Sequence, residues 1–231
     1  PITSLSGPRH TLAPQRRHFR RRRRHHPPPT DSTGARHAMS LKNTTDRWGG
    51  ISQLLHWTIA ILIVLIGIVG LVMGELPRSP KYFWVYTAHK SLGLTVLALV
   101  LVRIGWRLYA GAPRPVPGTP RLQALLASAT HGAIYLLILA LPLSGWIYDS
   151  ANALRPFRWF GLVEVPKLVA PDEALAASAH GAHEWLFWLL MALVAGHAGA
   201  ALYHHFIQRD ATLARMLPRR WITASPAKDP P

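Results

Sequence analysis

Histidines spaced along apolar segments are the side chains of this sequence best suited to chemistry. The clearest case is segment 178–206, which is long and apolar enough to cross a membrane as a helix and carries His183 and His197. Their spacing of fourteen residues corresponds to about 21 Å along a helix and falls roughly 40° short of four full turns. Both imidazoles therefore leave one face of the helix, at two depths. Because ionisable groups inside a membrane are costly and usually functional, this pattern suggests two stacked metal centres.

The elements that must position these histidines are four long apolar runs. In a chain of 231 residues, 49% of them hydrophobic, these runs predict an all-α protein, a membrane-spanning four-helix bundle. The predicted spans are 50–73, 83–109, 123–148 and 178–206. The sequence contains no cysteine. This excludes disulfides, iron-sulfur clusters and haem that have thiolate ligands, and haem attached by thioether bonds. A metal must therefore be held by His, Met or carboxylate side chains.

The formal charge of +16 is concentrated in part in residues 1–38, which hold nine Arg against one Asp. This leader lacks the apolar core of a signal peptide, so secretion is not indicated. We interpret residues 1–45 as a disordered basic leader, with Met39 as the expected true start, and residues 222–231 as a disordered tail. Nucleic-acid binding is disfavoured, because no stacking aromatics accompany the arginines. The functional domain is expected over residues 46–221.

Lysine and arginine are unevenly distributed over the connections between the predicted spans. The connection after the second span, with its flanking residues, and the C-terminal tail are rich in arginine and almost without acids, whereas the other two connections mix acids and bases. By the positive-inside rule, both termini and the middle connection are cytoplasmic.

This orientation sorts the histidines by depth. The inner set is His56, His131 and His197; the outer set is His89 with either His183 or His180. Two axial imidazoles suit a b-type haem used for electron transfer, whereas zinc prefers four ligands, and copper stays open as an alternative. His131 by itself is as well explained as a hydrogen-bonded core residue, or as a group that contacts a quinone, as it is as a metal ligand. His204 and His205 are expected at the solvated membrane edge.

Three further features of the spans bear on ligand binding. Arg103 and Arg107 share a helix face, where they either snorkel to lipid phosphate or clamp a carboxylate of a ligand. Pro142 predicts a kink that either opens space for a planar ligand or serves packing. Hydroxyls expected to orient the imidazoles are those of Ser52, Thr87 and Ser178.

Several motifs resemble the bacterial cytochrome b561 family. They are SQLLHW in the first span, AHKSLGLTVLALVLVRIGWRL in the second, HGAIYLLILALPLSGW in the third, and HEWLFWLLMALVAGHAGAALYHHF followed by RDATLARMLPRR at the end. The resemblance covers about residues 46–221. It implies a four-helix, multi-pass protein of the bacterial inner membrane with two haem b groups. It also implies axial ligation by His56 and His197 at the inner haem, and by His89 and His183 at the outer one.

The resemblance further implies single-electron transfer between an outer-face donor and the quinone pool. Some members are described as oxidising superoxide and reducing ubiquinone, so the chain is either an electron carrier or a superoxide:quinone oxidoreductase. A rival function is a cytochrome b subunit that anchors a hydrogenase or dehydrogenase, with a redox partner protein as electron donor. A rival of another class is a non-redox transporter or structural membrane protein.

Overall fold

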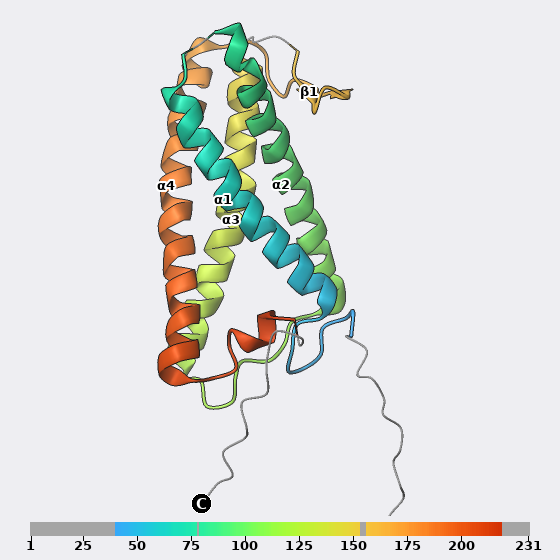
Figure 1. Ribbon diagram of the computed structural model, residues 1–231, viewed down its shortest axis with the longest axis vertical. Helices are drawn as coiled ribbons and strands as arrows, with labels where there is room; N and C mark the ends of the chain where they lie inside the picture. Colours follow the sequence, from blue (N-terminus) through green and yellow to red (C-terminus); the bar gives the residue numbers. More distant parts are fainter. Residues whose placement is uncertain (1–39, 78, 153–155, 219–231) are drawn as a thin grey trace, which may run out of the picture. The chain divides into compact units, whose positions relative to one another are not determined.

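Four long helices dominate the computed structural model, which describes residues 40–77, 79–152 and 156–218. They are α1 (Gly50–Glu75), α2 (Phe83–Ala110), α3 (Arg121–Ala151) and α4 (Glu173–Tyr203) (Figure 1). Each is long and apolar enough to cross a membrane, which confirms the all-α four-helix prediction. The predictions for residues 1–38, for Met39 as a start and for residues 222–231 lie outside the described residues.

The last two helices differ from their predicted bounds. α3 runs through Pro142 as a single helix and ends at Ala151. α4 begins five residues before the predicted start, where the Asp172 side chain accepts a hydrogen bond from the backbone N–H of Leu175 at 2.9 Å and caps the helix. Polar residues at these helix ends are typical of a connection between spans, so the predicted helices stopped short of them. In the structure these residues lie within helical turns.

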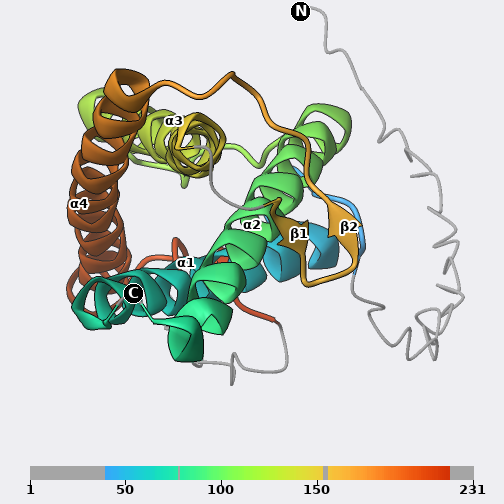
Figure 2. The ribbon, with the colours of Figure 1, turned by 90° about the horizontal axis from the view of Figure 1, so that it is seen from above.

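Neighbouring helices run in opposite directions along the chain, so each end of the bundle collects a defined set of segments (Figures 1 and 2). We call the end with residues 76–77, 79–82 and 156–172 the hairpin end. The other end, with residues 40–49, 111–120 and 209–217, is called the arm end. α3 packs most extensively against α4, and α1 against α2.

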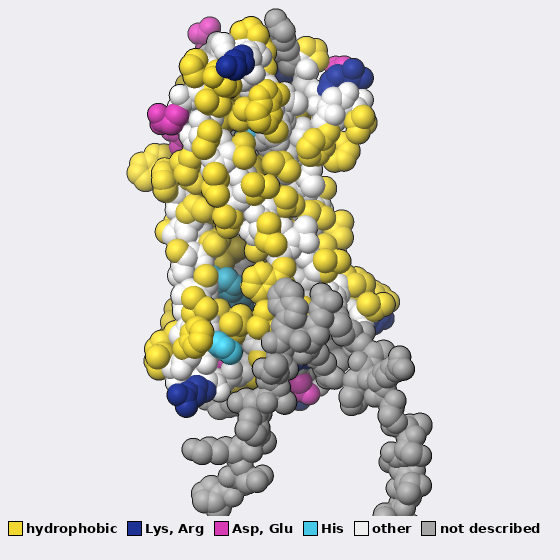
Figure 3. All heavy atoms as spheres, in the orientation of Figure 1, with side chains coloured by type: hydrophobic (Ala, Val, Ile, Leu, Met, Phe, Trp, Pro, Cys, Tyr) yellow, Lys and Arg dark blue, Asp and Glu magenta, His cyan; other side chains and the backbone are white. Residues whose placement is uncertain are grey.

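The outward faces of the helices are apolar. Side chains such as Leu108 and Trp185 are about four-fifths exposed, at 81% and 80%. Figure 3 shows hydrophobic side chains along the length of one face, with most charged side chains gathered toward its two ends. Such a surface suits lipid rather than water, because its side chains are apolar and most backbone polar groups are bonded within the helices.

A layer of buried aliphatic side chains crosses the middle of the bundle. On every helix these residues fall, in sequence, between the histidine levels of the bundle. They are Ile59, Ile63, Val96, Val100, Leu137, Ile138 and Leu190. The layer therefore separates the polar groups of the hairpin end from those of the arm end.

A short antiparallel hairpin, β1 (Arg158–Trp159) and β2 (Val163–Glu164), follows α3 and was not predicted. Its turn uses left-handed backbone at Phe160 and Gly161, with φ of 46° and 76°. The hairpin is fixed to α2, because the Trp159 indole donates to the Ser91 carbonyl at 3.2 Å and the Phe160 N–H donates to the Ser91 hydroxyl at 2.9 Å. It thereby braces the α2 turn that follows His89.

The chain beyond α4 folds back as an arm across the opposite end. A π-helical turn, η2 (His204–Gln208), leads through left-handed Arg209 to the short 3-10 helix η3 (Ala214–Met216). The carbonyls of Arg215, Met216 and Leu217 accept hydrogen bonds from Gln53, Trp57 and Arg47, respectively. This arm ties the C-terminal segment to the beginning of α1.

Candidate functional site

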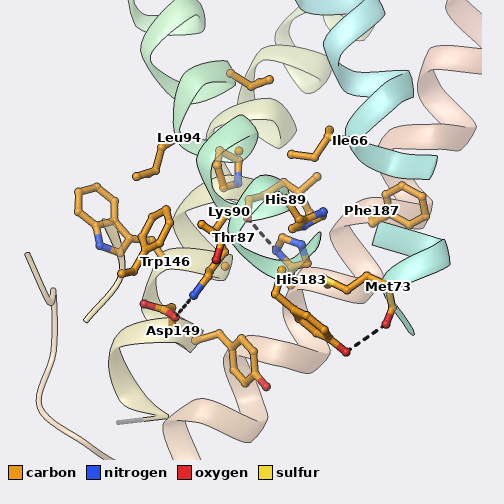
Figure 4. A pocket seen from close by; sticks show the side chains of 18 of the residues that line it. Ile66, Met73, Thr87, His89, Lys90, Leu94, Trp146, Asp149, His183 and Phe187 are labelled. Carbon is orange, nitrogen blue, oxygen red and sulfur yellow. Dashed lines mark hydrogen bonds and ion pairs between the residues drawn. The ribbon is translucent and has the colours of Figure 1, made fainter. Parts of the chain in front are cut away.

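At the hairpin end, α2 and α4 bring two imidazoles opposite each other across the bundle, with the rings steeply inclined. The ring centroids of His89 and His183 lie 6.1 Å apart, with an interplanar angle of 69° (Figure 4). A metal bound at about 2.0–2.1 Å to one nitrogen of each ring would place the centroids about 6 Å apart. The pair therefore has the separation that two axial ligands of one ion require.

The two rings line a cavity of about 660 Å³ that extends between all four helices. Its wall includes Gly67, Gly93 and Gly145 together with aliphatic and aromatic side chains. A Cβ atom added at Gly145 would lie 3.1 Å from His183 Cε1, and one added at Gly70 would lie 3.0 Å from His89 Cε1. Glycine at these positions therefore leaves room for the imidazoles at the cavity wall.

The second ring nitrogen of His183 is fixed by α3. Its Nδ1 lies 2.9 Å from the Leu141 carbonyl and 3.1 Å from the Ser144 hydroxyl, so Nδ1–H is the donor and Nε2 is left to bind a ligand. The predicted hydroxyls do not serve this purpose here. Thr87 and Ser178 each donate instead to the carbonyl four residues earlier in their own helices.

His89 is less completely bonded. Its Nδ1 is buried and makes no hydrogen bond within the described part of the chain. A buried imidazole nitrogen without a hydrogen bond costs free energy. The protein therefore orients the His89 ring less firmly than the His183 ring.

At the arm end, α1, α3 and α4 bring together three imidazoles. The ring centroids of His56 and His197 lie 6.2 Å apart at an interplanar angle of 75°, close to the values of the hairpin-end pair. His131 approaches His197 on another side, at 5.2 Å and 70°. The separation of His56 and His197 suits an ion between them, whereas His131 is closer to His197 than that arrangement requires.

Neither histidine group forms a conventional cluster of protein ligands. Among the described residues, no three or more His, Cys, Asp or Glu side chains are placed to hold one metal ion together. A tetrahedral zinc site of protein ligands therefore does not fit the described residues. Two imidazoles facing each other fit an iron whose remaining four ligands come from a macrocycle.

Sequence comparisons decide the family of this chain. The family model described as prokaryotic cytochrome b561 matches residues 47–219. The chain belongs to the prokaryotic cytochrome b561 family. It is 37% identical over 184 residues to cytochrome b561 homolog 2 of Escherichia coli (strain K12), covering 78% of this chain and 95% of that protein. It is 34% identical over 176 residues to cytochrome b561 homolog 1 of the same organism, covering 76% and 99%.

A third relative carries a more specific name. The chain is 32% identical over 168 residues to the probable superoxide oxidase CybB of Yersinia pestis, covering 72% of this chain and 93% of that protein. Membership of the cytochrome b561 family implies membrane electron transfer with haem b as the cofactor. The four spanning helices identify the chain as a multi-pass membrane protein.

The two arginines of α2, Arg103 and Arg107, contact different groups. Arg103 is half-buried and donates from Nε to the Tyr135 hydroxyl at 2.9 Å and from Nη1 to the Ser52 carbonyl at 3.0 Å. It therefore bonds to both α1 and α3, and whether it also contacts a lipid phosphate or a carboxylate of a ligand stays a prediction. The Arg107 guanidinium stacks 5.5 Å from the Trp48 ring and 6.0 Å from that of Tyr135. Neither arginine forms an ion pair with a described Asp or Glu.

The remaining histidines of the helical segments are not members of the two opposed pairs, although His180 lines the same cavity as His89 and His183. His180 is half-exposed, packs on Tyr148 at 4.9 Å between centroids, and lies 3.7 Å from the Glu184 carboxylate. His204 does not match the solvated edge residue predicted from the sequence. It is mostly buried, with Nδ1 2.5 Å from Asp210 and Nε2 2.8 Å from the Gln123 amide nitrogen. His205, by contrast, is exposed.

One group of charged residues near the hairpin-end cavity escaped the sequence analysis. Asp149, near the end of α3, is buried and bonded to the ammonium groups of Lys90 and Lys167. The sequence assigned Asp149 to a connection between spans, where an acid is ordinary. One feature of the sequence could have shown that Asp149 belongs to the helix. It follows the apolar run directly and lies within one helical turn of it.

Proposed function

We propose that this cytochrome b561-family protein is a di-haem membrane electron carrier that connects a donor at its outer face with the quinone pool. His89 and His183 would hold the outer haem b, and His56 and His197 the inner one. The observation that carries this proposal is the pair of facing imidazoles at each of two levels, with centroids 6.1 and 6.2 Å apart. Haem b, when bound, would supply a one-electron couple at each level, and two histidine ligands would fill the iron positions that the macrocycle leaves open.

The fold positions the two histidine levels and keeps them apart along the bundle. Fourteen residues separate His183 and His197 on α4, so the two levels are about 21 Å apart along the helix axis. The buried aliphatic layer between them forms an apolar barrier to ions in the middle of the bundle. Four helices thereby keep two redox centres apart while both stay within one membrane.

The arm end faces the cytoplasm of a bacterial inner membrane in this proposal. The positive-inside rule supports this orientation, because the basic residues near α2–α3 and after α4 gather at that end. Among the described residues they are Arg103, Arg107, Arg114, Arg121, Arg209 and Arg215. The hairpin end would then face the periplasm.

Arg103 and Arg107 would bind carboxylate groups of the inner cofactor. Both lie on the helix that faces the arm-end histidines, and neither has a described acidic partner. A guanidinium within a membrane bundle is stabilised by an anion, and its planar donors match a carboxylate. His131, which contacts the His197 ring, would contact the quinone rather than bind iron.

Superoxide is a candidate donor at the outer face, and ubiquinone the corresponding acceptor. The named superoxide oxidase relative supports this choice. Basic groups at the hairpin-end cavity, Lys90 and Arg158, would attract a small anion. In the balanced reaction, two superoxide ions each lose one electron and leave as O2. Ubiquinone takes up these two electrons and two protons to become ubiquinol.

Optical spectroscopy of the purified protein tests the cofactor content. We expect reduced-minus-oxidised bands of b-type haem with a stoichiometry of about two haems per chain. Stopped-flow mixing with superoxide then tests the substrate, with ubiquinone present or absent. Absence of b-type bands would refute electron transfer altogether, whereas two haems without superoxide consumption would refute only the proposed donor.

A further inference from the structure

A buried carboxylate with two lysine partners lies beside the hairpin-end histidines. One oxygen of Asp149 is 3.0 Å from Lys90 Nζ, and the other is 3.0 Å from Lys167 Nζ. Lys167 Nζ also donates to the Asp149 backbone carbonyl at 2.9 Å. Lys90 Nζ lies 4.7 Å from the ring centroid of Phe157, which restricts its position further. We call these three charged residues the Asp149 cluster.

The Asp149 cluster belongs to the wall of the outer cavity. Lys90 directly follows His89 in α2, and both Lys90 and Asp149 line the cavity with His89 and His183. Figure 4 shows the Lys90 side chain extending from α2 to Asp149 on α3, next to the two imidazoles. With two ammonium groups and one carboxylate, the cluster has a net charge of +1.

The arm end has a different charge balance. There, Arg103 bonds to a phenol and a backbone carbonyl, and Arg107 stacks on aromatic rings. Neither arginine has an ion pair with an acid among the described residues. The protein thus supplies a buried carboxylate at the outer level, and two arginines without a described counter-ion at the inner one.

We propose that Asp149 is a positioning residue that lowers the midpoint potential of the outer centre relative to the inner one and so directs electrons inward. This inference rests on the proposed di-haem function. An added electron is stabilised by nearby positive charge and destabilised by nearby negative charge, and charge near a buried centre acts strongly because the local dielectric is low. Asp149 offsets part of the positive charge of Lys90 and Lys167. Arg103 and Arg107 have no described protein acid beside them, so they offset the charge of the inner cofactor's own carboxylates and favour electron gain at the inner level. Each electron given up by the donor therefore moves toward the arm end.

Potentiometric titration of the purified holoprotein tests this proposal. Asp149→Asn removes the carboxylate charge with little change in shape, so we expect the outer midpoint potential to rise. Lys90→Gln removes one ammonium, so the same potential should fall. The shift should correspond to about a tenfold change in the ratio of reduced to oxidised outer centre, or about 59 mV for a one-electron couple. The inner potential should stay constant in both variants.

Controls separate a charge effect from a loss of structure. The His183→Ala variant identifies the outer component, because it removes one of its proposed ligands. Lys81→Gln removes an exposed lysine at the same end that does not line the cavity, and it should leave both potentials unchanged. If Asp149→Asn does not fold, Lys167→Gln provides a second test and should lower the outer potential.

The outcomes distinguish this inference from the function on which it rests. Shifts of the outer potential in opposite directions for Asp149→Asn and Lys90→Gln support the proposal, since damaged packing would not reverse its sign. Equal shifts in the same direction, or no shift, would overturn it while leaving a di-haem protein. A wild-type protein without two b-type haems would instead overturn the proposed function.

Discussion

At the scale of single residues, the orientation of the imidazoles depends on the hydrogen bonds of Nδ1 and on glycines that leave space for the rings. His183 is oriented by a backbone carbonyl and a hydroxyl of α3, whereas the His89 ring lies against α1 at Gly70. A hydrogen bond to the second nitrogen fixes the tautomer of a ligating histidine and the direction of its other nitrogen. The binding geometry therefore depends on residues that carry no redox chemistry themselves.

His131→Ala tests which imidazole is the partner of His197. The separation of 6.2 Å between the His56 and His197 centroids suits two ligands, and the 5.2 Å between His131 and His197 does not. We expect the variant to retain both haems by optical stoichiometry, with a changed rate of quinone reduction. The matched variant His56→Ala should lose one haem; if His131→Ala loses it instead, the inner pair has been assigned wrongly.

Gly145→Ala tests the space beside His183. The new Cβ would lie 3.1 Å from Cε1 and 3.2 Å from Nδ1 of an imidazole that α3 already holds. Overpacking of this kind costs about 1–3 kcal/mol, so we expect roughly tenfold weaker retention of the outer haem. Gly132→Ala on the same helix is the control, since its Cβ would meet no atom within 4 Å. Equal haem retention in the two variants would show that Gly145 does not shape the site.

At the scale of elements, the arm after α4 is held by one acid–base contact and several backbone acceptors. The contact between His204 and Asp210 closes the π-helical turn at the point where left-handed Arg209 reverses the chain. Burial alone would raise the pKa of Asp210, but hydrogen bonds from Thr212 and His204 outweigh it and hold the pKa below its ordinary value. The arm is therefore sensitive to acid at this residue.

The stabilising effect of Asp210 should disappear at low pH. Because its pKa is lower in the folded than in the unfolded state, the ionised group stabilises the fold above the ordinary Asp pKa of about 3.9. This contribution is lost as the pH falls through the lower, folded value. Thermal unfolding of wild type and Asp210→Asn should therefore differ at neutral pH, with the wild type more stable, and converge below that window. A constant difference at all pH values would contradict the linkage.

At the scale of the whole molecule, the apolar surface and the distribution of charge define a direction across the membrane. Four spanning helices present apolar side chains outward (Figure 3), and the arginine-rich connections that follow α2 and α4 lie at the arm end (Figure 1). The proposed electron transfer from the hairpin end to the arm end carries electrons toward the cytoplasm only if the arm end faces the cytoplasm.

Single cysteines can measure the orientation, because the chain has none of its own. Leu162→Cys lies at the exposed turn of the hairpin, and Ala112→Cys lies exposed in the connection between α2 and α3. A membrane-impermeant maleimide applied to intact spheroplasts should label Leu162→Cys and spare Ala112→Cys until the membrane is permeabilised. The reverse pattern would place the arm end outside and overturn the proposed direction of electron flow.

The sequence alone determined the four spans and the levels of the histidines. Length and hydropathy set the spans, since about 20 apolar residues are needed to cross a bilayer, and the helical repeat placed His183 and His197 on one face. Helix ends were less predictable, because a polar residue occurs both in the last turns of a helix, as Asp149 does, and just outside a helix, as Asp172 does. The regular period of a helix is a local property, so it can be read from neighbouring residues.

Only the tertiary structure decided which groups meet across the bundle. The bond of His183 to Leu141, the contact of Arg103 with Tyr135, and the Asp149 cluster all join different helices or distant segments. Such contacts depend on the rotation of each helix about its axis and on how neighbouring helices pack. No local pattern encodes them, because the partner of a side chain is set by the packing of the whole bundle.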